Sequence, residues 1–588
     1  MSKRADDGAK MPRQIPYIIG SEGCERFSFY GMRNILTPFL MTALLLHLPE
    51  GARKSMTNEV FHTFVMGVYF FPLLGGWLAD RYFGKFNTIL WFSLIYCVGH
   101  GFLAFFEDNV NGFFAGLFLI SLGAGGIKPL VASFVGDQFD ERNKHLAKVV
   151  FDAFYWIINF GSFFASLLMP VFLDQLGAQI AFGIPGALML IATIVLWLGK
   201  KHYVMVPVAP KNPHSFLRVV ITALGARDAR GQRGLGFWLA IVGVIPMIYA
   251  LSSFGAFLLG TALKIAPSDI GVRMIAWAKD MPIIERLDIV PAVCLGLVTM
   301  LALGGIGASR QLDRARGHHP DEAIEGVRAV LRILIVFALV TPFHSLFDQK
   351  ATTWVHQGGE MYVPGWDLDL GPLGMWETNF KPAQMQAFNP LLVMILIPFN
   401  NIVLYPWLRR RGWDPTSLRR MTLGIAFAGF AWVVAGGLQL VLDGGDKITI
   451  LWQVLPYAFL TLGEVLVSAT GLEFAYSQAP HAMKGVIMSF WNLTTTVGNL
   501  WVLLVNTSVR NDRVLATIED TGISSTAFLM FFFAAFAFAA ALVFKLYTRR
   551  YKMLDNYRTR DPKVASNRGA GDLELPAARV VKDTSDKE

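Results

Sequence analysis

Apolar runs of roughly 20 residues recur along the whole chain, and this feature constrains the fold more than any other. Each run is long enough to cross about 30 Å of hydrocarbon as a helix. Of the 588 residues, 54% are hydrophobic and 16% are charged, whereas soluble domains average about 25% charged residues. A soluble protein does not need so many runs of this length. The sequence therefore predicts an all-α polytopic membrane protein.

Fourteen spans are predicted. The first six cover 15–46, 57–80, 86–106, 112–136, 147–173 and 178–198. A polar, basic stretch from 199 to 234 follows, and then two further apolar runs at 236–261 and 287–308. The last six spans cover 330–356, 383–408, 417–442, 449–477, 483–507 and 523–547.

The spans divide the chain into five segments. These are a cytoplasmic N-terminus (1–14), an N-terminal six-helix bundle (15–198), a linker with two additional helices (199–329), a C-terminal six-helix bundle (330–547) and a cytoplasmic tail (548–588). The tail is charged and poor in aromatic residues, so we expect it to be disordered. Most basic loop residues lie on one side if both termini are cytoplasmic, as the positive-inside rule requires. The stretch between the two additional spans departs from the rule, because it places four basic residues outside.

Charge and cysteine content exclude some functions. The net charge of +9 is accounted for by the basic loops, so no nucleic-acid partner is expected. Cys24, Cys97 and Cys294 all lie in apolar runs, away from any CxxC or Cys/His cluster. Neither a disulfide nor a metal site is expected. No nucleophile–base set or phosphate-binding loop is found, so the chain is not expected to be an enzyme.

One loop motif supports a two-bundle architecture. After the second span the chain reads Gly76-Trp-Leu-Ala-Asp80-Arg81-Tyr-Phe-Gly84-Lys85. This resembles the Gly-x-x-x-Asp-Arg-x-x-Gly-Arg/Lys loop of the major facilitator superfamily, whose members consist of two pseudo-symmetric bundles. Asp80 and Arg81 could form a polar latch between the bundles. The alternative is an ordinary basic loop.

Charged residues inside the apolar runs point to an internal polar path, because an ionisable group at bilayer depth is costly. In the first span, helical periodicity places Glu22, Glu25, Arg26, Phe29, Tyr30 and Arg33 on one face. Further charges lie in other spans, at Lys128, Asp348, Lys350 and Glu464. Both halves therefore contribute charge to a shared interior. The alternative is that these residues form ion pairs that only hold the helices together.

Several motifs then resemble one family. Glu22-Gly-Cys-Glu25-Arg26-Phe27-Ser-Phe29-Tyr30-Gly31 is similar to the Glu-x-x-Glu-Arg-Phe-x-Tyr-Tyr-Gly signature of proton-dependent oligopeptide transporters. Other similar elements are Asn159-Phe-Gly-Ser162, Phe347-Asp348-Gln349, Asn389-Pro390 and Gly463-Glu464. Phe61-His62-Thr-Phe-Val and the segment 471–480 resemble mammalian members, whereas the fourteen-span layout resembles bacterial ones. The resemblance covers roughly residues 14–548 and is weak between about 199 and 325.

The resemblance implies a proton-coupled symporter that imports di- and tripeptides by alternating access, with the proton as coupling ion and no cofactor. It assigns proton coupling to Glu22, Glu25, Arg26, His62 and Asp348. It assigns substrate binding to Tyr30, Arg33, Tyr69, Lys128, Asn159, Asn389, Glu464 and Trp491. Arg33 with Asp348 would form an outer gate, and Lys128 with Glu464 an inner gate. Trp354 and Trp491 are candidate walls of side-chain pockets, with core packing as the alternative.

Two departures from the family pattern bear on selectivity. Phe29 stands where members usually have Tyr, and His344 stands where many have Trp, so the preferred peptide side chains are open. Alternatives to peptide import are a symporter for another small solute such as nitrate or an amino acid, and a drug exporter of the same superfamily. A channel, a receptor or a membrane enzyme is less compatible with the charge pattern. We expect a monomer in the bacterial inner membrane.

Overall fold

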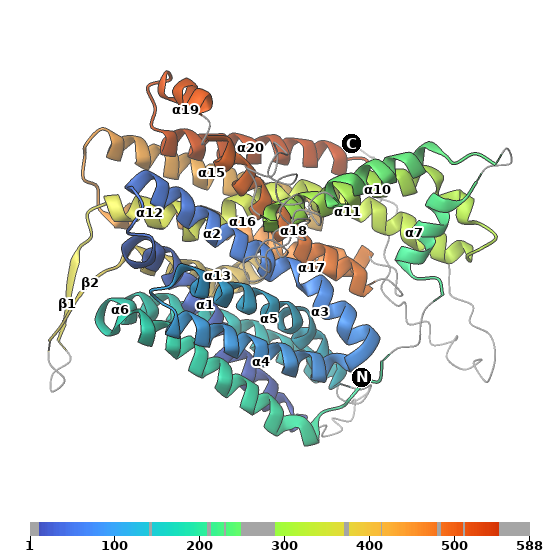
Figure 1. Cartoon of the computed structure of the whole chain (residues 1–588), viewed down its shortest axis with the longest axis horizontal. Helices are drawn as coiled ribbons and strands as arrows, with labels where there is room; N and C mark the ends of the chain where they lie inside the picture. Colours follow the sequence, from blue (N-terminus) through green and yellow to red (C-terminus); the bar gives the residue numbers. More distant parts are fainter. Residues whose placement is uncertain are drawn as a thin grey trace, which may run out of the picture.

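A computed structural model of the chain describes residues 11–139, 144–208, 213–227, 231–248, 289–369, 375–412, 414–478, 484–509 and 512–551. Within these residues the fold is helical apart from one two-stranded sheet (Figure 1). Much of the predicted N-terminal segment, nearly all of the predicted tail and part of both additional spans lie outside the described residues.

The N-terminal half folds into one bundle. Its helices are α1 (Ile15–Phe39), α2 (Glu50–Phe70), α3 (Pro72–Leu78), α4 (Gly84–Phe105), α5 (Val110–Asp137) and α6 (Lys144–Leu198). Five-residue π-helices, η1 (Leu40–Leu44) and η2 (Ala79–Phe83), extend α1 and α3. The long α6 contains two predicted spans, and the chain reverses at Gly177, whose φ of 80° is readily adopted only by glycine.

The rest of the chain forms a second bundle and its attachments. Helices α7 (Phe216–Gly225), Leu235–Ile248 and α10 (Ile289–Gln311) precede it. The bundle contains α11 (Asp321–Asp348), α12 (Thr353–Glu360), α13 (Phe388–Phe399), α14 (Tyr405–Arg410), α15 (Ser417–Asp443), α16 (Val454–Glu464), α17 (Thr470–Gln478), α18 (Lys484–Val509), α19 (Asp512–Glu519) and α20 (Ser525–Thr548). The π-helix η8 (Asn400–Leu404) joins α13 to α14, and η10 (Val465–Ala469) joins α16 to α17.

The buried apolar residues form two large clusters, one in each bundle, and a small third cluster in which Met66 of the first bundle packs against Leu500 and Leu503 of the second. One core consists of residues between Ile15 and Tyr203, with Ala351 as a single contribution from the other half. The second consists of residues between Val219 and Phe544. Helices within a bundle approach closely where glycines permit it. A Cβ atom on Gly75 of α3 would lie 2.3 Å from the carbonyl oxygen of Gly125 on α5, a contact that only small residues allow.

Strands β1 (Gly365–Asp369) and β2 (Met375–Asn379) form an antiparallel hairpin, with Gly365 opposite Asn379. The hairpin extends from one end of the bundles, which we call the hairpin side, and α7 lies at the opposite end, the connector side (Figure 1). Helix α1 runs from the connector side to the hairpin side, and α20 runs back. Seven described stretches are long and apolar enough to cross a membrane, and some of them, such as Glu50–Phe105, comprise successive helices.

Three features differ from the sequence-based expectation. Helix α11 begins at Asp321, nine residues before the predicted start at 330, because its first turns are polar and hydropathy detects only the apolar part. The connector contains α7, a short helix that is not predicted. The hairpin 365–379 is also absent from the prediction, which placed only a loop between spans ending at 356 and beginning at 383.

Candidate functional site

A cavity of about 230 Å³ lies between the two bundles. Eight of the predicted site residues line it: Tyr30, Arg33, Tyr69, Asn159, Asp348, Asn389, Glu464 and Trp491. They come from α1, α2 and α6 of the first bundle and from α11, α13, α16 and α18 of the second. Sequence analysis noted Lys350 as a charge within a span but gave it no role at the site, and it did not identify Ser468 and Asn492, which also line the cavity. A cavity with charges of both signs on opposite walls suits a ligand that carries both charges itself.

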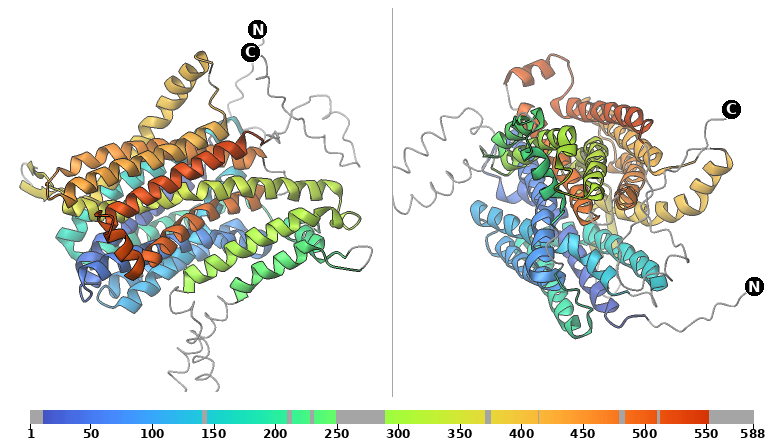
Figure 2. Two further views of the ribbon diagram at one scale, coloured as in Figure 1. Left: turned by 90° about the horizontal axis from the view of Figure 1, so that it is seen from above. Right: turned by 90° about the vertical axis from the view of Figure 1, so that its right-hand side faces the viewer.

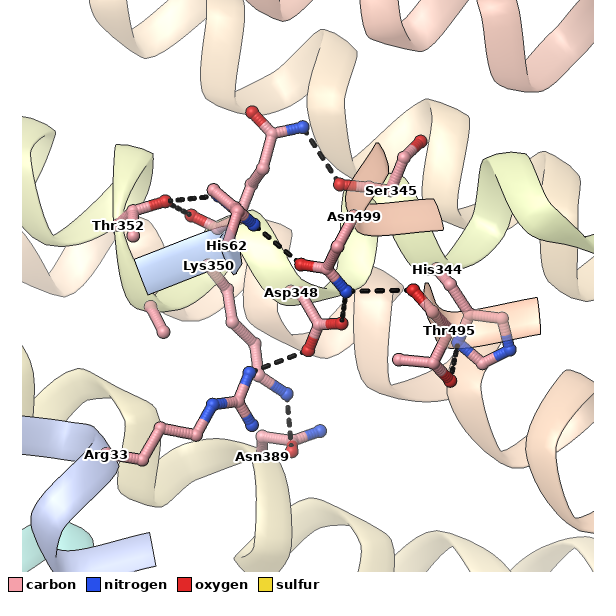
Figure 3. Close-up of polar contacts among 12 residues, drawn as sticks. Arg33, His62, His344, Ser345, Asp348, Lys350, Thr352, Asn389, Thr495 and Asn499 are labelled. Carbon is pink, nitrogen blue, oxygen red and sulfur yellow. Dashed lines mark hydrogen bonds and ion pairs between the residues drawn. The ribbon is translucent and has the colours of Figure 1, made fainter. Parts of the chain in front are cut away.

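An ion pair joins the bundles at this cavity. Arg33 donates to Asp348 at 2.6 Å, and both side chains are buried. The second carboxylate oxygen of Asp348 accepts a hydrogen bond of 2.8 Å from Asn499 (Figure 3). The predicted Arg33–Asp348 contact is therefore formed. Asn499 carries no signal in the sequence, because an uncharged amide in an apolar helix does not stand out.

The hydrogen-bond chain continues from Asn499 to His62. The Asn499 amide nitrogen donates to Asp348 and to the carbonyl of Thr495, so its oxygen accepts from Nδ1 of His62 at 2.7 Å. Nε2 of His62 lies 3.2 Å from the hydroxyl of Thr352. His62 is 0% exposed and does not line the cavity; instead it lies behind Asp348, linked to it through one amide (Figure 3).

This geometry can accommodate both protonation states of His62. In the neutral ring, Nε2 accepts a hydrogen bond from the Thr352 hydroxyl. In the protonated ring, Nε2 donates to the same hydroxyl oxygen, which then donates to the carbonyl of Gln349, 3.3 Å away. Proton uptake therefore requires only the rotation of one hydroxyl group.

A second polar cluster lies within the C-terminal bundle. Nζ of Lys350 donates to the side-chain oxygen of Asn389 at 2.7 Å, and the amide nitrogen of Asn389 donates to Glu464 at 2.5 Å and to Thr461 at 3.0 Å. Lys350 also lies 3.4 Å above the ring of Phe347. Asn389 therefore separates an ammonium from a carboxylate while bonding to both.

The remaining predicted residues lie deeper in the N-terminal bundle. Arg26 pairs with Glu22 at 3.0 Å and also with Glu25, and all three side chains are buried. The ammonium of Lys128 lies 3.6 Å from the ring centre of Phe29 and 4.5 Å from that of Tyr69. Neither this triad nor Lys128 lines the cavity.

Some predicted contacts are not formed in this conformation. Among the described residues no ion pair joins Lys128 to Glu464, because Lys128 lies over two aromatic rings and Glu464 accepts from Asn389. Trp354 lines no part of the cavity; it is fully buried against Trp432 and Tyr457, so core packing is the correct alternative for it. In the loop motif, Lys85 pairs with Asp137 of its own bundle at 2.7 Å. Within the described part of the chain no ion pair joins Asp80 or Arg81 to the other bundle.

Further contacts hold the bundles together on the hairpin side. Lys54 pairs with Glu360 at 3.1 Å, and Lys381 pairs with Asp174 at 2.8 Å. The hydroxyl of Thr37 donates to the carbonyl of Ala351 at 2.7 Å. A second cavity, of about 600 Å³, lies among these residues, and the two ion pairs are part of its wall. The central cavity is thus bounded on its hairpin side by contacts between the bundles.

The fold and the site define a transporter of the major facilitator type with a charged central cavity. Comparison with family models gives a match to the POT family over residues 86–250 and 303–520. This match covers more than half of the chain, and the chain therefore belongs to the POT family.

Solved structures of family members are similar over almost the full length. A structure described as an auto inhibited POT family peptide transporter is 61% identical with a TM-score of 0.83, covering 93% of this chain and 99% of that one. The POT family transporter PepTSo is 58% identical with a TM-score of 0.83, covering 92% and 98%.

Among curated proteins, solute carrier family 15 member 2 of Mus musculus is 30% identical over 453 residues, which is 74% of this chain and 50% of that protein. Peptide transporter 3 of Caenorhabditis elegans is 29% identical over 489 residues, which is 81% of this chain and 56% of that protein. The chain thus spans about half the length of the curated relatives it matches.

Proposed function

We propose that this chain is a proton-coupled symporter that imports di- and tripeptides by alternating access. The observation that carries the proposal is the charged cavity between the bundles, with Arg33 on one wall and Lys350, Asp348 and Glu464 on the other. The similar solved proteins are described as a peptide transporter and as a proton dependent oligopeptide family transporter.

The charge arrangement matches the chemistry of a short peptide. A peptide carries a carboxylate and an ammonium, and it offers amide groups between them. Arg33 of the first bundle supplies a cationic pole, and Glu464 of the second supplies the anionic pole. Lys128 lies beside the ring of Tyr69, outside the cavity lining, and would join the cationic pole only in another conformation. Asn159 and Asn389, with Tyr30 and Tyr69, can donate or accept hydrogen bonds to the backbone of any peptide. Trp491 provides an apolar wall for a side chain.

Proton coupling is assigned to two groups of residues. In the first, His62 takes up a proton and keeps it, and its positive charge lies near Asp348, to which it is linked through the Asn499 amide. This charge competes with Arg33 for the carboxylate, weakens the Arg33–Asp348 pair and favours opening on the hairpin side. In the second, Arg26 is balanced by Glu22 and Glu25, and protonation of either carboxylate would release the guanidinium. A proton drives transport only if it binds one conformation more tightly than the other.

The conformation described here is assigned as inward-facing. We place both termini in the cytoplasm of a bacterial inner membrane, so the hairpin side faces outward. On that side Arg33–Asp348 acts as the outer gate and is closed. Lys128 and Glu464, which make no contact here, would meet as the inner gate when the carrier opens outward. A monomer suffices for this cycle, because the cavity lies within one chain.

The direct test is uptake of radiolabelled dialanine by proteoliposomes containing the purified protein. We expect accumulation when an inward proton gradient is imposed and little when a proton ionophore removes it. One charge moved across 100 mV supplies about 2.3 kcal/mol, enough for roughly fifty-fold accumulation. Competition by tripeptides, but not by nitrate or free alanine, distinguishes peptide transport from the other solutes. Uptake that is independent of the proton gradient, or that nitrate inhibits, would contradict the proposal.

A further inference from the structure

The span that consists of α13, η8 and α14 departs from the bundle in a way that peptide transport does not explain. Helix α13 continues through the π-helix η8 into α14, and no residue of α14 is buried. Figure 2 shows this segment, in gold, projecting from the side of the molecule in both views. A π-helix within a span commonly marks a functional distortion.

The projecting segment has a continuous apolar surface. Phe399, Ile402 and Val403 have exposed fractions of 47%, 74% and 49%, and Trp407 follows at 47%. These side chains lead along the helix toward the connector side. Their arrangement fits acyl chains, which are apolar and flexible enough to follow an irregular helix surface.

A basic cluster continues directly from the apolar surface. It comprises Arg409, Arg410, Arg411, Arg419 and Arg420, from the end of α14 and the start of α15. Two of these arginines are neutralised by carboxylates, Arg409 by Asp414 at 3.4 Å and Arg420 by Glu473 at 3.0 Å. The others keep their positive charge available.

Arg410 and Arg411 are the best placed of these residues for a ligand. Within the described part of the chain the side chain of Arg410 makes no hydrogen bond or ion pair, and that of Arg411 lies 4.7 Å above the ring of Trp407. Guanidinium groups bind phosphate through paired hydrogen bonds. Tryptophan favours the headgroup level of a bilayer. A lipid phosphate at this level would lie beside Arg410 and Arg411, and its tails would extend into the hydrocarbon along η8.

We propose that α14 and the start of α15 form a binding site for an anionic phospholipid, with its phosphate at Arg410 and Arg411 and its tails along η8. Basic sites on the cytoplasmic side of membrane helices suit such headgroups. A second copy of the chain fits this surface poorly, because a two-fold contact would bring identical arginine clusters together. The proposal does not depend on peptide transport, since binding is measured without peptide.

The test is native mass spectrometry of the purified full chain titrated with phosphatidylglycerol or with phosphatidylcholine of identical acyl chains. We expect preferential binding of phosphatidylglycerol. The R410Q/R411Q variant should bind it about 5- to 25-fold more weakly, since each arginine near a membrane surface contributes about 1 kcal/mol. The matched control is K200Q/K201Q, which removes the same charge from another exposed position on the connector side and should leave binding unchanged.

Several outcomes would overturn the proposal. Equal binding of the two lipids, or equal weakening by both double variants, would show that the cluster is not a specific site. Displacement of the lipid by millimolar glycerol phosphate would assign the site to a soluble phosphate. A mass corresponding to a dimer that R410Q/R411Q abolishes would assign the surface to self-association. Monodisperse elution of each variant confirms that it is folded before binding is compared.

Discussion

At the residue scale, the sequence identifies the charges of the site but not the uncharged groups that position them. Glu22, Arg33, Asp348 and Glu464 stand out because ionisable residues are rare in apolar helices. Asn499, which donates to Asp348, does not stand out, and neither do Thr352 beside His62 and Thr461 beside Asn389. Polar uncharged side chains are common in such helices. Lys350 is visible as a charge, yet its partner Asn389 is 39 residues away in the chain. Only the folded bundle brings the two together.

His62 gives the first prediction. Glutamine can keep hydrogen bonds to Asn499 and Thr352 but cannot carry a proton. We therefore expect H62Q to fold and to lose most of the acid stimulation of dialanine uptake. The measurement is initial uptake rate against external pH in proteoliposomes. An unchanged pH profile in H62Q would assign coupling to the Glu22–Glu25–Arg26 triad alone.

Asn389 gives the second prediction. Its amide bonds to both Lys350 and Glu464, and a hydrogen bond to a charged group contributes about 1.5–3 kcal/mol. N389A should raise the KM for dialanine roughly 10- to 100-fold, because Lys350 and Glu464 both lose the amide that orients them. The control is N87A, since Asn87 is exposed and donates only to the carbonyl of Phe83. A KM within about twofold of the native value would show that Asn389 is not part of the site.

At the scale of elements, the apolar runs predict spans well because their polar ends coincide with the membrane surface. The prediction 417–442 corresponds to α15 at Ser417–Asp443, and 523–547 to α20 at Ser525–Thr548. The break between 173 and 178 falls at Gly177. Features without a hydropathy signal escape this reasoning. They include the hairpin and the π-helices η8 and η10. Helix α7 is apolar, but its ten residues are too few to be counted as a span.

The packing of α3 on α5 gives the third prediction. A Cβ on Gly75 would lie 2.3 Å from the carbonyl of Gly125, so the helices must separate to accept a larger side chain. G75V should destabilise the protein by about 1–3 kcal/mol, as overpacking generally does, and should lower the apparent Tm in detergent. G101V is the matched control, since nothing lies within 4 Å of a Cβ at Gly101. Equal Tm values for the two variants would contradict the packing argument.

At the scale of the whole molecule, two bundles with separate cores can move as rigid bodies if the contacts between them are exchangeable. The hairpin-side contacts are mainly polar and include two half-exposed ion pairs, Lys54–Glu360 and Asp174–Lys381. The first bundle supplies the cation of one pair, Lys54, and the anion of the other, Asp174. Pairs of this kind contribute only about 0.2–1 kcal/mol each. They can therefore shift an equilibrium between inward-open and outward-open conformations of similar free energy, and they are weak enough to break in every transport cycle.

The last prediction concerns that equilibrium. The double variant D174N/E360Q removes both ion pairs and should increase the ratio of outward-open to inward-open molecules roughly 2- to 30-fold. The populations can be measured by double electron–electron resonance between spin labels at Leu46 and Tyr362, two exposed positions of different bundles on the hairpin side.

Three controls separate this effect from others. The D174K/K381D variant exchanges the two charges and keeps the Asp174–Lys381 ion pair, so the distance distribution between the labels should stay as in the native protein. E473Q breaks an ion pair within one bundle and should leave the distances unaltered. High salt should reproduce part of the effect of D174N/E360Q, since screening weakens exposed pairs. If neutralisation leaves the distance distribution as it is in the native protein, the remaining contacts, such as the buried Arg33–Asp348 pair and the Thr37–Ala351 hydrogen bond, suffice to hold this side closed.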